Sequence, residues 1–324
     1  MENEFGHWIK IFITFGIARC AVPLFFMFSS YLQAKKNDSY KILLKKRAKS
    51  LLLPYLLWMT LLAFFYGGLK LIIAKIAPQI LGRPEDTCLT WSALDWIHKI
   101  FGYKPKIDGS GFELPEFAAQ FWFVRDLMIL VILSPVLKLF IKKFPIGFFS
   151  FALVIFVTPV RVYFVETTAF FFYIAGLYWG IYDFPLFQKI DKIKWKEILP
   201  LLILTIIAAF TFGEGEHSTI YNFMVIFDCV IFIKFSAFII QKEKLYSICS
   251  YLSGFSFFLF AIHSPILNGY TSKLWIRFFP MKNTFYSMCQ YFIPTLLTVV
   301  IGTGIGSILK KTCPPLFKAL NGGR

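Results

Sequence analysis

The sequence predicts an all-α polytopic membrane protein, a bundle of about nine transmembrane helices of about 20 residues each. Three observations lead to this fold class. Residues of the set AVILMFWYC make up 57% of the 324 positions, whereas soluble domains reach about 45–50% even with glycine counted. Charged residues are only 16%, against a usual value of about 25%. The chain holds 41 phenylalanines and has a mean hydropathy of +0.66, so a water-soluble fold would expose large apolar patches.

The transmembrane helices are predicted from runs that are too apolar to be loops. In chain order these candidate spans are 9–32, 51–69, 121–141, 146–164, 167–184, 198–212, 219–240, 246–267 and 285–309. Several of them hold a proline, a glycine or a lone charge, which a helix buried in a bundle tolerates. The sequence shows no internal repeat and no linker, so we expect a single domain over residues 1–324.

One long polar insert interrupts the apolar pattern, at about 70–120. It contains amphipathic pieces such as 91–101, whose apolar face suits a position on the membrane surface. We expect the insert to form a cap on the outer side of the membrane.

The net charge of +16 comes from 34 Lys and Arg against 18 Asp and Glu. When alternate loops are assigned to alternate sides of the membrane, nearly all of the excess positive charge falls on one side. That side holds the 33–50 loop, 138–143, 189–196, 242–244 and the tail from 310. Because cytoplasmic loops are rich in Lys and Arg, this side and the C-terminus are predicted to be cytoplasmic, and an odd number of spans places the N-terminus outside. Topology explains the charge, so we expect no nucleic-acid partner.

Common site motifs are missing from the sequence. Its six cysteines include no CxxC pair, and there is no Walker A, GxGxxG, HExxH or GxSxG motif. We therefore expect no metal site and no bound cofactor.

A charged pair, Arg125 and Asp126, opens the third span beside Trp122. Charges inside a span cost about 2.5–3.5 kcal/mol on insertion scales and are functional candidates by default. Adjacent helix residues point about 100° apart, so we expect each to have a partner on another helix, with Glu166 and Arg161 as candidates. The alternative is an aromatic belt at the membrane interface with a local ion pair.

Two further residues inside spans are candidates for chemistry or binding. His263 lies near the outer end of the eighth span, where it is either a general base or a satisfied core residue. Arg19 lies in the first span, where it either binds an anionic group or pairs with Asp228 or Asp126.

The densest basic cluster includes Lys46, Arg47 and Lys49, directly before the second span. These residues either anchor the cytoplasmic side of that helix or bind the phosphates of an anionic donor, because Arg and Lys at a helix start bind phosphate well.

Several segments resemble, in order along the chain, those of the integral-membrane acyltransferase 3 family, which acylates bacterial cell-surface glycans. Arg125, Asp126 and the preceding Trp122 fall in a segment similar to the Trp-x-x-Arg-Asp-Leu segment of that family. The matching segments are 18–32, 46–58, 121–135, 170–180 and 256–267.

The resemblance implies a ten-helix bundle in the bacterial plasma membrane, and we expect this chain to lack the first helix, which carries the family histidine. It also implies transfer of an acyl group, expected to be acetyl, from cytosolic acyl-CoA as co-substrate to a hydroxyl of a glycan or lipid-linked sugar. Lys46, Arg47 and Lys49 would then bind the CoA phosphates, and Arg19 would line the buried path. A catalytically inactive truncated member and a polytopic transporter are the alternatives.

The resemblance also assigns roles at the outer side. Arg125 and Asp126, with Trp122, would shape the acceptor or oxyanion region, and His263 would support it. Glu166 is expected at the same depth, as part of the substrate-binding set.

Overall fold

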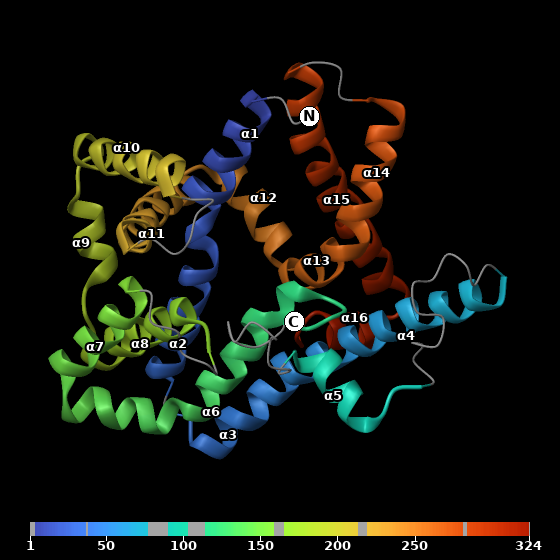
Figure 1. The fold of residues 1–324 in the computed structure, drawn as a ribbon. Helices are drawn as coiled ribbons and strands as arrows, with labels where there is room; N and C mark the ends of the chain where they lie inside the picture. The colour runs from blue at the N-terminus through green and yellow to red at the C-terminus, as the bar shows by residue number, and fades with distance from the viewer. Residues whose placement is uncertain are drawn as a thin grey trace. The chain divides into compact units, whose positions relative to one another are not determined.

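The computed structural model describes residues 4–36, 38–76, 90–102, 114–158, 165–212, 219–280 and 284–323. Within these ranges every regular element is a helix and none is a strand (Figure 1). The all-α fold class is therefore confirmed. Arg161 and most of the expected cap, 77–89 and 103–113, lie outside the described residues.

The described part of the chain holds five helices that are long and apolar enough to cross a membrane. Two bent pairs raise this number to seven if each pair is one span, namely Thr167–Tyr182 with Leu186–Lys192 and Glu243–Ser253 with Ser256–Phe278. The protein is thus a multi-pass helical membrane protein, and the total of nine spans stays a prediction. The five straight spans are Gly6–Lys35, Tyr40–Ile73, Trp195–Phe212, Thr219–Ile240 and Phe285–Thr312.

The helices group into two compact units. The first unit comprises residues 1–40, 129–253 and 273–295. It contains α1 (Glu4–Ile11), η1 (Phe12–Ile17), η2 (Ala18–Cys20), α2 (Ala21–Lys35), α7 (Pro145–Val157), α8 (Thr167–Tyr182), α9 (Leu186–Lys192), α10 (Trp195–Phe212), α11 (Thr219–Ile240) and α12 (Glu243–Ser253).

The close approach of α2 and α8 forms the core of this first unit. Gly176 and Gly180 are spaced as in GxxxG motifs, in which small residues let helix backbones approach closely. A Cβ atom added to Gly176 would overlap the Met27 carbonyl oxygen, and one added to Gly180 would lie 2.5 Å from the Ala34 Cβ. These two positions therefore have no room for a side chain.

The second unit comprises residues 41–128, 254–272 and 296–324. Its elements are α3 (Tyr40–Arg47), η3 (Ala48–Leu52), α4 (Leu53–Ile76), α5 (Ala93–Phe101), η5 (Ala119–Phe121), α13 (Ser256–Ile262), η6 (His263–Leu267) and α16 (Pro314–Leu320), with parts of α6 (Trp122–Lys143), α14 (Asn268–Phe278) and α15 (Thr284–Thr312).

The basic segment before α4 was expected to be a loop, but it is helical from Tyr40 through Leu52. Leucine and lysine, which dominate this segment, are both good helix formers. Lys46, Arg47 and Lys49 therefore lie on helical turns that run directly into α4.

Helix α5 is fixed at both ends and docks on α4. Ser92 and Asp95 form a capping box at its start, and Gly102 ends it in the left-handed conformation with φ 74°, which glycine adopts without steric cost. The Tyr55 hydroxyl on α4 donates to the Ile100 carbonyl at 2.7 Å, and the Tyr55 ring stacks on Phe101. These contacts set the position of the C-terminal end of α5, which reaches the candidate site.

Candidate active site

Arg125 and Asp126 lie in the N-terminal part of α6 and are both buried, with 7% and 0% of their surfaces exposed. Arg125 Nε donates to Asp126 Oδ1 at 3.0 Å, and Arg125 Nη1 donates to the Phe101 carbonyl at the end of α5 at 2.9 Å. The prediction that these neighbours do not face each other was therefore wrong. The 100° rule describes the directions of the Cβ atoms, whereas the long arginine side chain can still place its Nε beside the carboxylate of the next residue.

His263 begins η6, directly after α13, and is half-buried. Its Nδ1 lies 2.5 Å from the Phe260 carbonyl oxygen. A carbonyl oxygen only accepts hydrogen bonds, so Nδ1 is the donor in this contact, and the tautomer that fits it has its lone pair at Nε2. In the part of the chain that the structure describes, Nε2 has no hydrogen-bond partner. This tautomer suits a general base.

Contacts in the second unit connect the His263 segment to the start of α6. Gln120 Nε2 donates to the Ser264 carbonyl, one residue after His263. The Phe260 ring lies 4.5 Å from the Phe123 ring and 5.9 Å from the His263 imidazole, centroid to centroid. The structure therefore brings the two predicted catalytic segments into one packed cluster. No sequence signal marks Gln120 or Phe260, because their role depends on contacts between segments far apart in the chain.

The predicted donor-binding residues lie at the end of α3 and in η3, just before α4. Lys46 and Lys49 are exposed and Arg47 is half-buried. The C-terminal segment packs nearby, because Trp58 Nε1 donates to the Leu320 carbonyl at 3.0 Å and Gly322, with φ 76°, passes close to the Ser50 carbonyl. The three basic side chains thus lie on the helical turns just before α4, where the C-terminal segment passes close to Ser50.

Trp122 is the first residue of α6 and is half-buried, with its ring edge-to-face on Phe123 at 6.4 Å. Glu166 is exposed at the N-cap of α8 and belongs to the first unit, as does Arg19. Trp122 therefore joins the Arg125 cluster, and the expected substrate-binding roles of Glu166 and Arg19 stay predictions.

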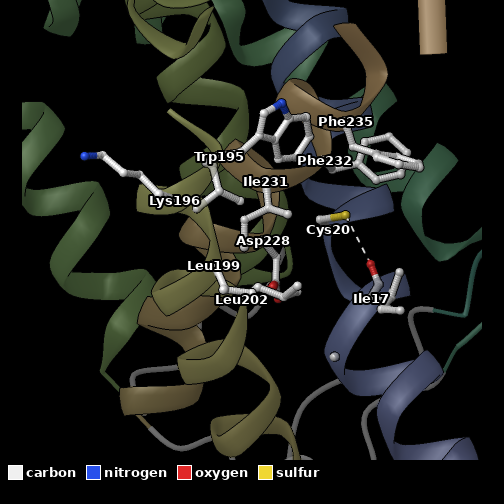
Figure 2. Close-up of a pocket in the computed structure, with 12 residues that line it drawn as sticks. Ile17, Cys20, Trp195, Lys196, Leu199, Leu202, Asp228, Ile231, Phe232 and Phe235 are labelled. Atoms are coloured by element: carbon white, nitrogen blue, oxygen red, sulfur yellow. Dashed lines mark hydrogen bonds between the residues drawn. The ribbon is translucent and has the colours of Figure 1, made fainter. Parts of the chain in front are cut away.

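Figure 2 shows a cavity of about 650 Å³ in the first unit, between η1, α10 and α11. Its walls are apolar apart from the buried Asp228 carboxyl and Lys196, whose side chain extends away from the other lining residues. Arg19 stands 5.8 Å from the centre of the Tyr221 ring. In the described part of the chain Arg19 forms no ion pair with Asp228, so that expected partner is not found.

Comparison with known proteins shows which protein family the chain belongs to. A family model described as an acyltransferase domain matches residues 2–306. The chain belongs to the acyltransferase 3 family. This acyltransferase is similar to the succinoglycan biosynthesis protein ExoH of Rhizobium meliloti (strain 1021), at 23% identity over 333 residues that cover 98% of this chain and 82% of ExoH. No solved structure matches the acyltransferase.

Family membership confirms the resemblance drawn from the ordered segments and establishes an acyltransferase in place of a transporter. Both the Arg125 segment and the His263 segment fall inside the range that the family model matches.

Proposed function

We propose that this acyltransferase transfers an acetyl group from acyl-CoA on the cytoplasmic side to a hydroxyl of an exported or cell-surface glycan. One observation carries the proposal for the site: the His263 tautomer, with its Nε2 lone pair, lies in the same packed cluster as the buried Arg125–Asp126 pair. The similarity to a protein named for succinoglycan biosynthesis supports a polysaccharide acceptor.

The proposed chemistry uses residues of the second unit only. Nε2 of His263 takes the proton from the sugar hydroxyl as its oxygen attacks the thioester carbonyl carbon. The cationic Arg125 guanidinium stabilises the negative charge that develops on the carbonyl oxygen. The carbon–sulfur bond then breaks, the ester forms, and the proton passes from His263 to the CoA thiolate.

Asp126 has a positioning role in this scheme. Its carboxylate accepts from Nε of Arg125 at 3.0 Å while the Phe101 carbonyl accepts from Nη1 at 2.9 Å. Two acceptors on different helices fix the plane of the guanidinium, which is the preorganisation that electrostatic catalysis requires.

Lys46, Arg47 and Lys49 are proposed to hold the phosphates of the donor. Their clustering on the last turn of α3 and on η3, just before α4, gives a concentrated positive charge that suits the CoA phosphates. Arg47 is the best single candidate, because its planar guanidinium binds phosphate oxygens in pairs.

The test of the donor site is the Arg47→Ala variant, assayed for acyl transfer to a glycan in membranes. We expect the KM for acetyl-CoA to rise about tenfold or more, the loss expected for a charge-assisted bond of about 1.5–3 kcal/mol. Lys41→Ala, on the exposed surface of the same α3 helix, is the matched control and should leave this KM unchanged. An unchanged KM in Arg47→Ala would refute the donor assignment.

We further propose that the C-terminus faces the cytoplasm, which follows from the basic residues of the tail. A phosphatase fused after Arg324 is active only outside the cytoplasm, so we expect an inactive fusion. An active fusion would reverse the orientation and would place the basic cluster on the wrong side for cytosolic acyl-CoA.

A further inference from the structure

A second cavity lies within the second unit and is not part of the site described above. Its volume is about 250 Å³, which is below the roughly 300–1,000 Å³ of pockets for drug-sized ligands. This volume suits a single small ring. The lining residues come from α4, from the segments on either side of α5, and from η6: Tyr66, Gly67, Trp91, Glu116, Phe117 and Pro265.

The carboxylate in this cavity is held in a fixed position. The Glu116 backbone N–H donates to the Lys99 carbonyl at 3.0 Å, and Lys99 Nζ lies 2.7 Å from Glu116 Oε2. The Glu116 side chain is still 49% exposed, so it remains open to a ligand. A carboxylate that is both fixed and accessible accepts strong hydrogen bonds from hydroxyl groups.

The aromatic wall of the cavity is equally well supported. The Trp91 ring packs against Phe117 at 5.7 Å and against Trp96 at 4.9 Å, and Lys99 Nζ stands 4.6 Å from the Trp91 ring centre. Tyr66 adds a second large ring to the lining. Tryptophan and tyrosine bury large apolar area while retaining polar groups, so together with Glu116 they offer apolar faces and a hydroxyl acceptor to one ligand.

That combination matches the chemistry of a sugar ring, which has apolar C–H faces and a rim of hydroxyl donors. The cavity also adjoins the proposed catalytic segment. Pro265 lines it, two residues after His263, and the intervening Ser264 carbonyl accepts from Gln120. A ring bound here would lie next to the segment that carries the proposed base.

We propose that this cavity binds one pyranose ring of the acceptor glycan, with Trp91 and Tyr66 against the ring and Glu116 accepting from its hydroxyls. The inference rests on the proposed function for the identity of the acceptor, but it assigns a binding site and residues that the proposed chemistry does not use.

The binding test uses the purified full chain in detergent, without acyl-CoA. Saturation-transfer NMR would measure binding of the methyl pyranosides of glucose, galactose, mannose and N-acetylglucosamine, with cyclohexanol as a ring of similar size and one hydroxyl. We expect at least one pyranoside to bind more tightly than cyclohexanol. In Trp91→Ala and Glu116→Gln its Kd should rise about tenfold or more. Leu94→Ala, on the exposed surface of α5 and outside the lining, is the matched control and should bind as the wild type does.

A second measurement covers the case in which Trp91→Ala does not fold. Glu116→Gln has nearly the same shape as the wild type and should raise the KM for the acceptor while leaving the KM for acetyl-CoA unchanged. The site is refuted if none of the four pyranosides binds the wild type, or if both variants bind as the wild type does. Because binding is measured without a donor, sugar binding without any transfer would overturn the proposed function and leave this site standing.

Discussion

Arg125 Nε lies 3.0 Å from Asp126 Oδ1, although the two residues are consecutive on α6, and both side chains are buried. The same guanidinium donates to the Phe101 carbonyl of α5. These contacts therefore join the start of α6 to the end of α5. This connection fixes the Arg125 guanidinium, which we propose stabilises the oxyanion.

Asp126→Leu should destabilise the protein and abolish transfer. It leaves the buried Arg125 charge without its carboxylate, and removing one partner of a buried ion pair costs about 3–5 kcal/mol. The checks are the melting temperature in detergent and the rate of acyl transfer. Lys138→Met, farther along the same helix, is the control. It should leave both the melting temperature and the rate of acyl transfer close to the wild-type values. A variant that melts as the wild type does would show that the pair contributes nothing to stability.

His263→Gln should lower kcat by about 10²–10⁴, the usual contribution of a positioned general base, with little change in either KM. His7→Gln is the control, because His7 lies on α1 in the first unit and packs beside Trp8. Steady-state assays on both variants, with matched expression, measure the effect. An active His263→Gln enzyme would mean that the histidine is only a satisfied core residue.

The contact between α2 and α8 depends on two glycines. Gly176→Ala and Gly180→Ala should each destabilise the protein by about 1–3 kcal/mol or more, as overpacking does, because the added Cβ meets the α2 backbone or Ala34. Gly147→Ala on α7 meets nothing within 4 Å and should be neutral or slightly stabilising. The melting temperatures of the three variants test this prediction. If all three variants melt at the same temperature, the close packing of α2 and α8 is contradicted.

The start of α5 should weaken in acid. The Ser92 hydroxyl, and after it the Ser92 backbone N–H, hold the pKa of Asp95 below its ordinary value of 3.8. A carboxylate with a lowered pKa stabilises the folded helix fully above its ordinary pKa, and this contribution is lost as the pH falls through the lowered value. Hydrogen exchange of the first α5 amides, corrected for intrinsic rates, should show this loss.

Ser92→Ala serves as the comparison for that measurement. It should lower amide protection at neutral pH by about fivefold, the effect of losing an N-cap side chain, and should flatten the acid response. Protection that is the same at neutral and acid pH in the wild-type protein would show that the capping box does not stabilise α5.

The sequence predicted the straight spans well, because an apolar run such as 219–240 matches the helix Thr219–Ile240 at both ends. It did not predict the bend after α8, where Asp183 adopts φ 51° and the chain turns by 100° into α9. The predicted span 167–184 ends at this bend, and the charged residues after it were assigned to a loop, so the short helix α9 was not expected.

The candidate site was predicted as residues but not as contacts. Arg125, Asp126 and His263 stood out because polar groups in apolar helices are rare. Their partners Phe101 and Phe260 contribute backbone carbonyls, which every residue has, so no side-chain pattern marks them. Glu116 and Trp91 were not predicted as site residues. They lie in a polar insert, where a single charged or aromatic residue does not stand out from its neighbours.

The most direct test of the central claim is transfer of isotope-labelled acetyl from acetyl-CoA to a polysaccharide oligomer by the purified chain in proteoliposomes. Mass spectrometry would detect the product. We predict a labelled ester that mild base removes and that His263→Gln and Asp126→Leu fail to form. A folded wild-type protein that yields no labelled ester, or variants that yield as much as the wild type, would contradict the account.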